Sequence, residues 1–452
     1  MYDLIVLGGG PGGYMAAERA GGAGLSVLLI EKNKIGGVCL NEGCVPSKTL
    51  LNSAKIYDYA THGQKYGVTT EKAKIDQTVV IARKDKVVRN LVAGVKSTLK
   101  RNHVTIQDGF GQILGRENGV IRVAVGEQVF EGKQLIIATG SEAVVPPIPG
   151  VREGLEQGTV LTNREILSLT EIPESLVVVG GGVIGLEMAS YYQTVGSAVT
   201  VIEMLDHIAG NADRELTAIL QKNFEKKGIV FHLNAQVTAV GDGLVTFTKN
   251  GATLKAPAAK TLMSVGRRAV TTGFGLETLG VYTERGRIIT DAQGRTNVPG
   301  VYAIGDANGV WMLAHAAYRE AEVAVNTILG KKDTMRYNAM PSVLYTSPEM
   351  AFVGETEETA TAKGLMFEKK VLPMNFSGRY MAENEGGDGI IKLLIDPDHQ
   401  RILGCHLLGS YASEIILSAG ILVESEMRLE ANKELIFPHP TVAEIIREAI
   451  FH

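Results

Sequence analysis

The stretch YDLIVLGGGPGGYMAAERAG, residues 2–21, joins an apolar run, a cluster of glycines and a helix-forming segment. Gly8, Gly10 and Gly13 fit the pattern G-x-G-x-x-G, and a second apolar run, LSVLLIE, ends at Glu31. This order predicts a strand, a tight turn, a helix and a second strand. Glycines let the backbone approach a pyrophosphate at a helix start, and the acid can bind a ribose hydroxyl. The stretch therefore predicts a dinucleotide site.

The same pattern returns in SLVVVGGGVIGLEMASYYQTVGSAVTVIE, residues 175–203, with glycines at Gly180, Gly182 and Gly185 and an acid at Glu203. In both copies the acid follows the last glycine at the same offset. Glycine turns that merely pack helix on sheet are the alternative, but the repeated offset favours two nucleotide sites. Two sites on one chain indicate a flavin and a nicotinamide.

The acid of the second copy bears on which nicotinamide cofactor binds. A carboxylate at Glu203 suits the free 2'-hydroxyl of NAD and repels the 2'-phosphate of NADP. The segment that follows, MLDHIAG at residues 204–210, offers no arginine pair to hold that phosphate. We therefore expect NAD.

Three further turns follow apolar runs and supply candidate cofactor-binding residues. They are Gly140 in LIIATGS, Gly266 in TLMSVGRR and Asp306 in VYAIGDA. An acid directly after a strand and a glycine can bind the ribityl part of a flavin, although a solvated turn acid would look the same. We include Asp306 among the flavin-binding residues.

Composition limits the other possibilities. The chain has 452 residues, which predicts two to four domains, and its net charge of -4 argues against a general nucleic-acid binder. No uncharged apolar run is long enough to predict a membrane helix, and Asp3 stands where a signal peptide would be basic. Only 3 cysteines are present, which fits a reducing compartment. We expect a cytoplasmic protein.

Cys39 and Cys44 lie close together in GGVCLNEGCVPSK, residues 36–48. They could form a redox disulfide, belong to a metal site, or be two unrelated buried thiols. Zinc would need two more ligands, and the other cysteine, Cys405, has only His406 beside it in a strand-like run. We therefore expect no metal, while the flavin signal nearby favours a redox pair.

Helix geometry restricts this segment if the disulfide forms. In a regular helix, residues five apart have Cα atoms about 8.7 Å apart, whereas a disulfide tolerates up to about 7 Å. Gly43 and Pro46 permit a bend, and Pro46 is acceptable in the first turn of a helix that begins near Cys44 and runs through residues 47–60. Such a start would stabilise a Cys44 thiolate.

Between the two copies, we expect a lysine-rich helical stretch and then a β-meander around GRENGVIRVAV, residues 115–125. PPIPG, residues 146–150, is predicted to be a rigid linker. After about residue 335, strand-like runs such as IIKLLID and ILGCHLLG alternate with helical segments, which predicts an α+β domain.

GGVCLNEGCVPSK resembles the redox-active disulfide motif of the flavin-dependent pyridine nucleotide–disulfide oxidoreductases. The resemblance covers the whole chain through GGGVIGLE, TNVPGVYAIGDA, MLAHAA, PSVLYTSPEMAFVG and HPTVAE. It implies an α/β fold with two Rossmann-like domains of the glutathione-reductase type and a C-terminal α+β dimerisation domain. The expected segments are an FAD-binding domain at 1–145, an NAD-binding domain at 146–268, a second FAD-domain part at 269–335 and the dimerisation domain at 336–452.

The resemblance also implies roles for individual residues. Cys39 matches the interchange thiol that meets the substrate, and Cys44 matches the thiol beside the flavin. Lys48 matches a lysine near the flavin, where Glu187 is its carboxylate partner. His439 matches the general base, supplied by the second subunit of a homodimer, and Glu444 is the acid that orients it.

The activity implied is oxidation of protein-bound dihydrolipoyl-lysine through the cysteine pair and FAD to NAD. The partner would be a lipoyl-bearing protein of a 2-oxoacid dehydrogenase complex or of the glycine-cleavage system. The alternatives are a reductase of another small disulfide and a non-catalytic flavoprotein subunit. Two residues depart from the family pattern: Glu42, where an apolar residue is usual, could raise a thiol pKa or face solvent, and Pro438 precedes the base.

Overall fold

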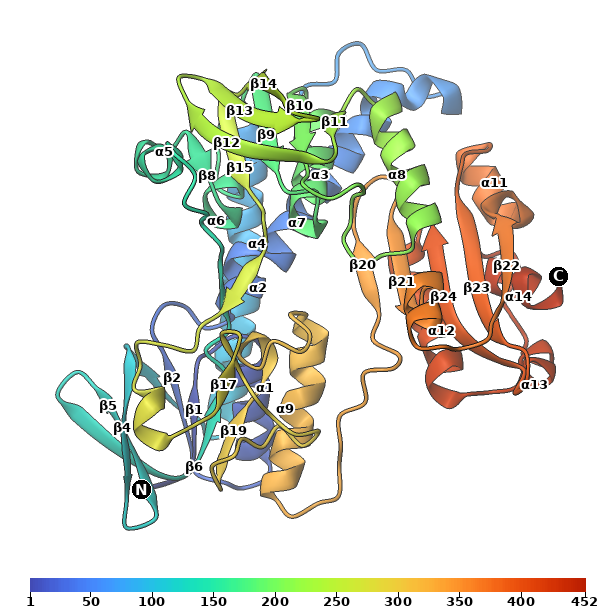
Figure 1. Ribbon diagram of the computed structural model, residues 1–452. Helices are drawn as coiled ribbons and strands as arrows, with labels where there is room; N and C mark the ends of the chain where they lie inside the picture. Colours follow the sequence, from blue (N-terminus) through green and yellow to red (C-terminus); the bar gives the residue numbers. More distant parts are fainter. The chain divides into compact units, whose positions relative to one another are not determined.

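The computed structural model describes residues 1–452, and the chain forms two compact units (Figure 1). The first unit contains Met1–Leu50, Thr78–Val144 and Gly266–Arg336. The second contains Leu51–Gln77, Val145–Val265 and Tyr337–His452. The limits predicted for the individual domains stay predictions.

A seven-stranded sheet in the order β3-β2-β1-β6-β5-β4, with β19 beside β6, forms the centre of the first unit. Its strands are β1 (Tyr2–Leu7), β2 (Val27–Glu31), β3 (Thr105–Asp108), β4 (Gly111–Glu117), β5 (Val120–Val125), β6 (Gln128–Ile137) and β19 (Val301–Ala303). β1, β2, β3 and β19 run parallel to their neighbours, and every residue of β2 is buried, as a strand covered on both faces requires. β4, β5 and the start of β6 form the predicted antiparallel meander.

A small residue allows two helices of this unit, α1 and α9, to pack closely. The helices of the unit are α1 (Pro11–Gly22), α2 (Gly37–Glu42), α4 (Gln77–Arg101) and α9 (Ala314–Ile328), with α3 (Cys44–His62) beginning in this unit. A Cβ added at Gly12 would lie 3.2 Å from Ile304 and 3.5 Å from Ala317 at the start of α9. Close packing of α1 and α9 therefore depends on the absence of a side chain there.

The second unit contains a five-stranded parallel sheet in the order β11-β10-β9-β15-β8. Its strands are β8 (Val160–Leu161), β9 (Ser175–Val179), β10 (Ala198–Ile202), β11 (Val230–His232) and β15 (Lys260–Met263). The accompanying elements are α5 (Val151–Gln157), α6 (Asn163–Ile166), α7 (Val183–Thr194), α8 (Arg214–Lys226) and an antiparallel meander of β12 (Ala235–Gly241), β13 (Leu244–Lys249) and β14 (Ala252–Pro257). Both predicted strand–turn–helix–strand segments are thus confirmed.

The C-terminal part of the second unit is an antiparallel sheet in the order β20-β21-β24-β23-β22 with helices, as the change of pattern predicts. The strands are β20 (Ser342–Leu344), β21 (Met350–Gly354), β22 (Glu368–Pro373), β23 (Ile390–Asp396) and β24 (Arg401–Leu408). The helices are α10 (Glu357–Ala362), α11 (Gly378–Asn384), α12 (Ala412–Ser425), α13 (Leu429–Lys433) and α14 (Glu444–Phe451).

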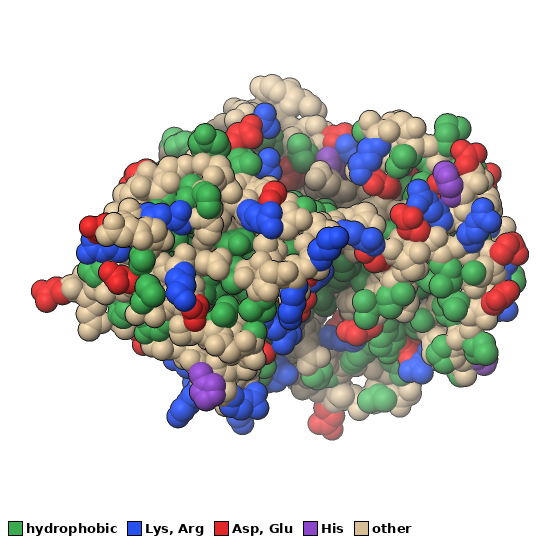
Figure 2. Space-filling model, turned by 90° about the horizontal axis from the view of Figure 1, so that it is seen from below, with side chains coloured by type: hydrophobic (Ala, Val, Ile, Leu, Met, Phe, Trp, Pro, Cys, Tyr) green, Lys and Arg blue, Asp and Glu red, His purple; other side chains and the backbone are tan.

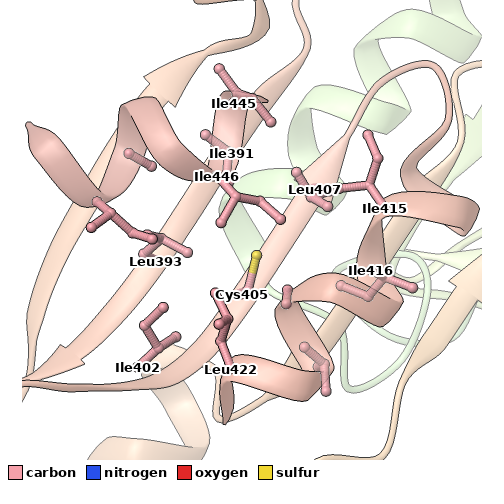
Figure 3. Close-up of a cluster of buried hydrophobic side chains, with 14 of the residues drawn as sticks. Ile391, Leu393, Ile402, Cys405, Leu407, Ile415, Ile416, Leu422, Ile445 and Ile446 are labelled. Carbon is pink, nitrogen blue, oxygen red and sulfur yellow. The ribbon is translucent and has the colours of Figure 1, made fainter. Parts of the chain in front are cut away.

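The third cysteine belongs to the core of this C-terminal part. Cys405 is fully buried, and its sulfur lies among isoleucine and leucine side chains of β23, β24, α12 and α14 (Figure 3). Burial raises the pKa of the Cys405 thiol to about 12, so the thiol stays protonated. Its role here is packing.

The surface carries charges of both signs. On the face drawn in Figure 2, basic and acidic side chains are interspersed among hydrophobic ones. No helix is long and apolar enough to cross a membrane.

Candidate active site

The first glycine loop, residues 8–13, is closed so tightly that side chains are excluded at two positions. Gly8 has a φ of +107°, and a Cβ there would overlap the backbone of Ala138 at the end of β6. A Cβ at Gly13 would overlap the carbonyl oxygen of Gly8. These contacts hold the start of α1 against the strand ends, which is the reason for glycine at both positions.

Glu31 fixes the path of the chain around this loop. One carboxylate oxygen accepts the N–H of Gly9 at 2.6 Å and the other accepts the N–H of Asn33 at 2.7 Å. The N–H of Gly36 in turn donates to the carbonyl of Gly9 at 2.8 Å. The acid predicted for ribose binding thus also anchors the loop.

The second glycine loop, residues 180–185, repeats this arrangement. Gly180 has a φ of +102°, and a Cβ there would lie 2.6 Å from the carbonyl oxygen of Ser264. Glu203 accepts the N–H of Gly181 at 2.6 Å and that of Leu205 at 2.8 Å. The two copies therefore share a geometry as well as a sequence pattern.

Both loops fit a bound pyrophosphate. Gly10 and Gly182 cap α1 and α7 without any side-chain bond, and neither helix has an acid in its first turn. A Cβ at Gly182 would meet nothing within 4 Å, and one at Gly10 only Gly37 at 3.9 Å, so space is open at each helix start. Open N–H groups and a clear approach are what a pyrophosphate requires.

The remaining predicted cofactor residues lie around a short ribbon of β7 (Ser141–Ala143) and β16 (Arg267–Ala269). Gly140 and Gly266, with φ of +72° and +119°, directly precede the two strands. Asp306, in the short helix Gly305–Ala307, accepts a hydrogen bond from the Ser141 hydroxyl. Their roles in cofactor binding stay predictions.

Cys39 and Cys44 are both thiols in this structure and lie in contact. Cys39 is on α2, Cys44 is the first residue of α3, and Gly43, with φ of -149° and ψ of -110°, is neither helical nor extended and separates the helices. The expected bend at Gly43 and the helix start at Cys44 are confirmed. A hydrogen bond with Cys44 and burial raise the pKa of Cys39, while the Lys48 ammonium opposes the rise.

Lys48 and Glu187 lie in different units, and their pairing stays a prediction. Lys48 is on the first turns of α3, where its Nζ lies 3.3 Å from the Ser47 hydroxyl. Glu187 is buried on α7 and accepts the backbone N–H of Tyr345 at 3.2 Å. A buried carboxylate on the helix that follows the second glycine loop is uncommon, because burial of a charge is costly.

His439 and Glu444 are brought together near the C-terminus. The histidine Nδ1 lies 2.8 Å from one oxygen of Glu444, whose other oxygen accepts the N–H of Thr441 at 2.8 Å. Although partial burial opposes it, these two hydrogen bonds hold the pKa of Glu444 below its ordinary value. A charged Glu444 fixes Nδ1 as the protonated nitrogen, which leaves Nε2 to accept a proton. Pro438 accepts a bond from the Thr441 hydroxyl at 2.9 Å and so belongs to the same turn.

Sequence reasoning missed two groups near the predicted site. Arg267 donates from Nε to the Ser141 hydroxyl at 2.7 Å and from Nη2 to the Ser141 carbonyl at 2.8 Å. Tyr14 of α1 and Tyr318 of α9 share a hydrogen bond of 2.6 Å between their hydroxyls, close to both redox cysteines. Only the adjacency of Arg267 to the predicted glycine turn at Gly266 could have pointed to it.

The chain has two glycine loops that fit a dinucleotide, and a pair of contacting thiols follows the first loop directly. This combination defines a class of enzyme. Such a protein passes electrons between a dithiol–disulfide couple and dinucleotide cofactors. Residues 2–321 match the family described as pyridine nucleotide-disulphide oxidoreductase, and residues 340–450 match the dimerisation domain of that family. The chain belongs to this family, which confirms the predicted fold class and the predicted cofactors, FAD and NAD.

Individual relatives are similar over their full length. The chain is 38% identical to the mitochondrial dihydrolipoyl dehydrogenase of Dictyostelium discoideum, covering 99% of this chain and 93% of the relative. Among solved structures, LpdA from Mycobacterium tuberculosis superimposes with a TM-score of 0.90 at 26% identity, covering 99% and 98% of the two chains. The HOCl-induced flavoprotein disulfide reductase RclA from Escherichia coli, solved as a Cu(II) complex, gives 0.86 at 27% identity, covering 100% and 99%.

Proposed function

We propose that this protein oxidises the dihydrolipoyl-lysine of a lipoyl-bearing protein to lipoyl-lysine and reduces NAD. The observation that carries the proposal is the contact between Cys39 and Cys44 at the start of α3, in a chain similar along its length to a dihydrolipoyl dehydrogenase. FAD, bound at the first glycine loop, supplies two-electron chemistry between the thiols and the nicotinamide. NAD binds at the second loop.

Dithiol–disulfide exchange assigns different tasks to the two sulfurs. The substrate thiolate attacks the sulfur of Cys39, the Cys39–Cys44 bond breaks, and Cys44 leaves as a thiolate. The second substrate thiol then displaces Cys39, so one disulfide is lost in the protein and one is formed in the substrate. A helix start stabilises the Cys44 thiolate, which supports this order.

His439 is proposed as the base that takes the substrate proton. Its Nδ1 is held by Glu444, which leaves Nε2 as the proton acceptor, and the side chain is 76% exposed on its own chain. Exposure of this kind suits a base that serves the cysteines of a second subunit. The family's dimerisation domain, residues 340–450, supports a homodimer.

Apolar side chains on α12 also support a second copy of this chain. Leu417 and Ile421 lie one turn apart on this helix and are 66% and 57% exposed. Ile436, in the loop before His439, is 97% exposed. Large apolar groups left in water in this part of the chain favour burial in a dimer.

The lipoyl-bearing partner belongs to a 2-oxoacid dehydrogenase complex or to the glycine-cleavage system. Activity of the purified protein with lipoyl domains of both kinds distinguishes the two. We place the protein in the cytoplasm, because its few cysteines suit a reducing compartment.

A second candidate function is reduction of another small disulfide. The similarity to the disulfide reductase RclA, at 27% identity, is its only support, and the higher identity of 38% to a dihydrolipoyl dehydrogenase does not favour it. Glu203 supports the first candidate over an NADPH-dependent reductase, because a carboxylate repels the 2'-phosphate of that donor.

Rapid mixing of the oxidised holoenzyme with dihydrolipoamide tests the proposal. We expect a long-wavelength charge-transfer band from the Cys44 thiolate and the flavin, and we expect Cys44→Ser to lack it. Reduction by NADPH without reduction by dihydrolipoamide would contradict the assignment.

Replacement of the proposed base gives a second test. His439→Gln is expected to slow dithiol oxidation by about 10²–10⁴-fold while FAD stays bound. His399→Gln is a matched control, because His399 forms a similar surface contact of 2.9 Å with Asp396 but has no proposed role. Equal rates for the two variants would remove His439 as the base.

A further inference from the structure

The turn that carries His439 is closed by hydrogen bonds from one further residue, Thr441. The Thr441 hydroxyl donates to the carbonyl oxygen of Pro438 at 2.9 Å, and this bond spans His439. The backbone N–H of Thr441 donates at 2.8 Å to the oxygen of Glu444 that does not face the imidazole. Thr441 therefore holds both the backbone at His439 and the carboxylate that pairs with its ring.

A buried serine from another element holds the same turn. Ser377 is the cap residue of α11 and is 1% exposed. Its hydroxyl oxygen accepts the N–H of Tyr380 at 3.2 Å, and its hydroxyl group donates to the carbonyl oxygen of Thr441 at 3.1 Å. A hydroxyl has a single hydrogen to donate, and here that hydrogen is directed at the turn. Ser377 thus ties Thr441 to the buried start of α11.

The imidazole depends on these bonds because it lies at the surface. The His439 side chain is 76% exposed, so packing contributes little to the orientation of its ring. Glu444, which pairs with the ring, is the first residue of α14, and the cap residue Ala443 forms no side-chain bond there. The orientation of the ring therefore follows that of Glu444, and the orientation of Glu444 follows that of Thr441.

We propose that Thr441 and Ser377 are positioning residues for the base. They hold the turn so that Glu444 keeps Nδ1 of His439 protonated and Nε2 free to accept the substrate proton. The inference deepens the proposed function and rests on it. Neither hydroxyl transfers a proton itself, and each acts through the Glu444–His439 pair. Proton transfer slows steeply when a base is displaced from its productive geometry.

Two half-reactions of the holoenzyme separate positioning from general stability. Reduction by dihydrolipoamide requires the base, whereas hydride transfer from NADH to the flavin does not. Thr441→Val is expected to slow the first about tenfold, with a similar loss of kcat and little change in KM, and to leave the second within about twofold.

Two further variants complete this test. Thr441→Ser keeps the hydroxyl and is expected to restore most of the rate with dihydrolipoamide. Thr361→Val, on α10, removes a similar hydroxyl-to-carbonyl bond of 2.7 Å far along the chain from the base and is expected to leave both half-reactions unchanged.

The serine is tested against a second helix cap. Ser377→Ala removes the cap of α11 together with the bond to Thr441 and is expected to slow reduction by dihydrolipoamide about threefold to tenfold. Thr356→Ala removes only a cap, the 3.1 Å bond to the N–H of Thr359 at the start of α10. The two variants should lose similar stability, but only Ser377→Ala should lose rate.

Action through the base predicts that the effects are not additive. In a His439→Gln background, Thr441→Val is expected to slow reduction by dihydrolipoamide by less than about twofold more. A further tenfold loss in that background would overturn the inference. A Thr441→Val enzyme that dihydrolipoamide reduces as fast as the wild type would also overturn it, while leaving the proposed function intact.

Hydrogen exchange reads the turn without any substrate. Peptides that cover residues 438–444 of the resting holoenzyme are expected to exchange at least about threefold faster in Thr441→Val and Ser377→Ala than in Thr361→Val. Equal exchange in all three variants would show that the two hydroxyls do not hold the turn. If dihydrolipoamide fails to reduce the wild type, the proposed function fails, and the exchange result still decides whether these hydroxyls hold the Glu444–His439 pair.

Discussion

The chain around residues 2–31 and that around 175–203 make the same hydrogen bonds. In each, an acid accepts one loop N–H and the N–H two residues beyond itself. In each, the returning chain donates to the middle glycine of the loop at 2.8 Å, from Gly36 in one copy and Ala209 in the other. Local geometry is thus set by the shared pattern.

The copies differ in where the chain goes next. After Gly36 the first copy continues into α2 and α3, which carry the redox thiols. After Ala209 the second copy continues to Asp213, which caps α8 and binds the ammonium of Lys392 on β23 at 2.9 Å. The same binding loop is thus followed by thiols in one place and by a structural anchor in the other.

The largest expected effect comes from filling the loops themselves. Gly13→Ala and Gly185→Ala each place a Cβ against the carbonyl oxygen that begins the loop, Gly8 or Gly180. We expect each variant to lose more than about 4 kcal/mol of stability, read as loss of soluble protein and a lower melting temperature. If only one is affected, the geometric equivalence of the loops is wrong.

The anchor of the second copy gives the next largest effect. Lys392 is 1% exposed and also pairs with Glu215 at 2.9 Å and with Glu357. Asp213→Ala is expected to cost about 3 kcal/mol, since it removes a buried partner and a helix cap, while Asp213→Asn keeps the cap. Thermal unfolding measures both.

The exposed pair Lys433–Glu430, 2.8 Å apart, provides the control for the anchor. Lys433→Ala is expected to cost less than about 1 kcal/mol. A melting temperature lowered equally by Lys433→Ala and Asp213→Ala would show that burial of the Lys392 cluster contributes nothing.

A smaller effect separates cofactor binding from folding. A Cβ at Gly182 has room in the protein but lies where a pyrophosphate would approach. Gly182→Ala should melt like the wild type and bind NADH about tenfold to a hundredfold more weakly in calorimetric titration. Gly241→Ala, which also has room for its Cβ, is the control, and equal NADH affinity in both would place the pyrophosphate elsewhere.

The smallest effect concerns the choice of nicotinamide. Glu203→Ala is expected to weaken NADH binding about tenfold and NADPH binding less, since the carboxylate favours only the free 2'-hydroxyl. Glu31→Ala, in contrast, should alter flavin content rather than NADH affinity. An equal loss of NADH and NADPH affinity in Glu203→Ala would contradict the role of Glu203 in selecting NADH over NADPH.

The features that could be predicted from the sequence are those that residues close together in the chain determine. The glycine spacing and the strand-end acids specify the loops locally, and Gly43 with the cysteine spacing specifies the helix start at Cys44. Side chains that depend on distant partners were not predictable. Arg267 and Arg268 are adjacent arginines, yet strand alternation turns the first toward Ser141 and the second toward exposed Glu142.

Lys392 illustrates the same limit in a different way. It interrupts the apolar run IIKLLID, where a lysine suggests an exposed edge. Its anionic partners come from the start of α8 and from α10, and the sequence of its own strand does not indicate them. The roles of His439 and Glu444 were likewise implied only by family resemblance.

The exposure of the His439 side chain has a genetic consequence in the proposed dimer. A Cys44→Ser chain keeps a good base, and a His439→Gln chain keeps good thiols, so neither homodimer works but a mixed dimer contains one intact site. Random reassociation of equal amounts should then recover about a quarter of wild-type activity from two inactive proteins. Complementation of this kind would show that two differently damaged copies can together supply an active enzyme.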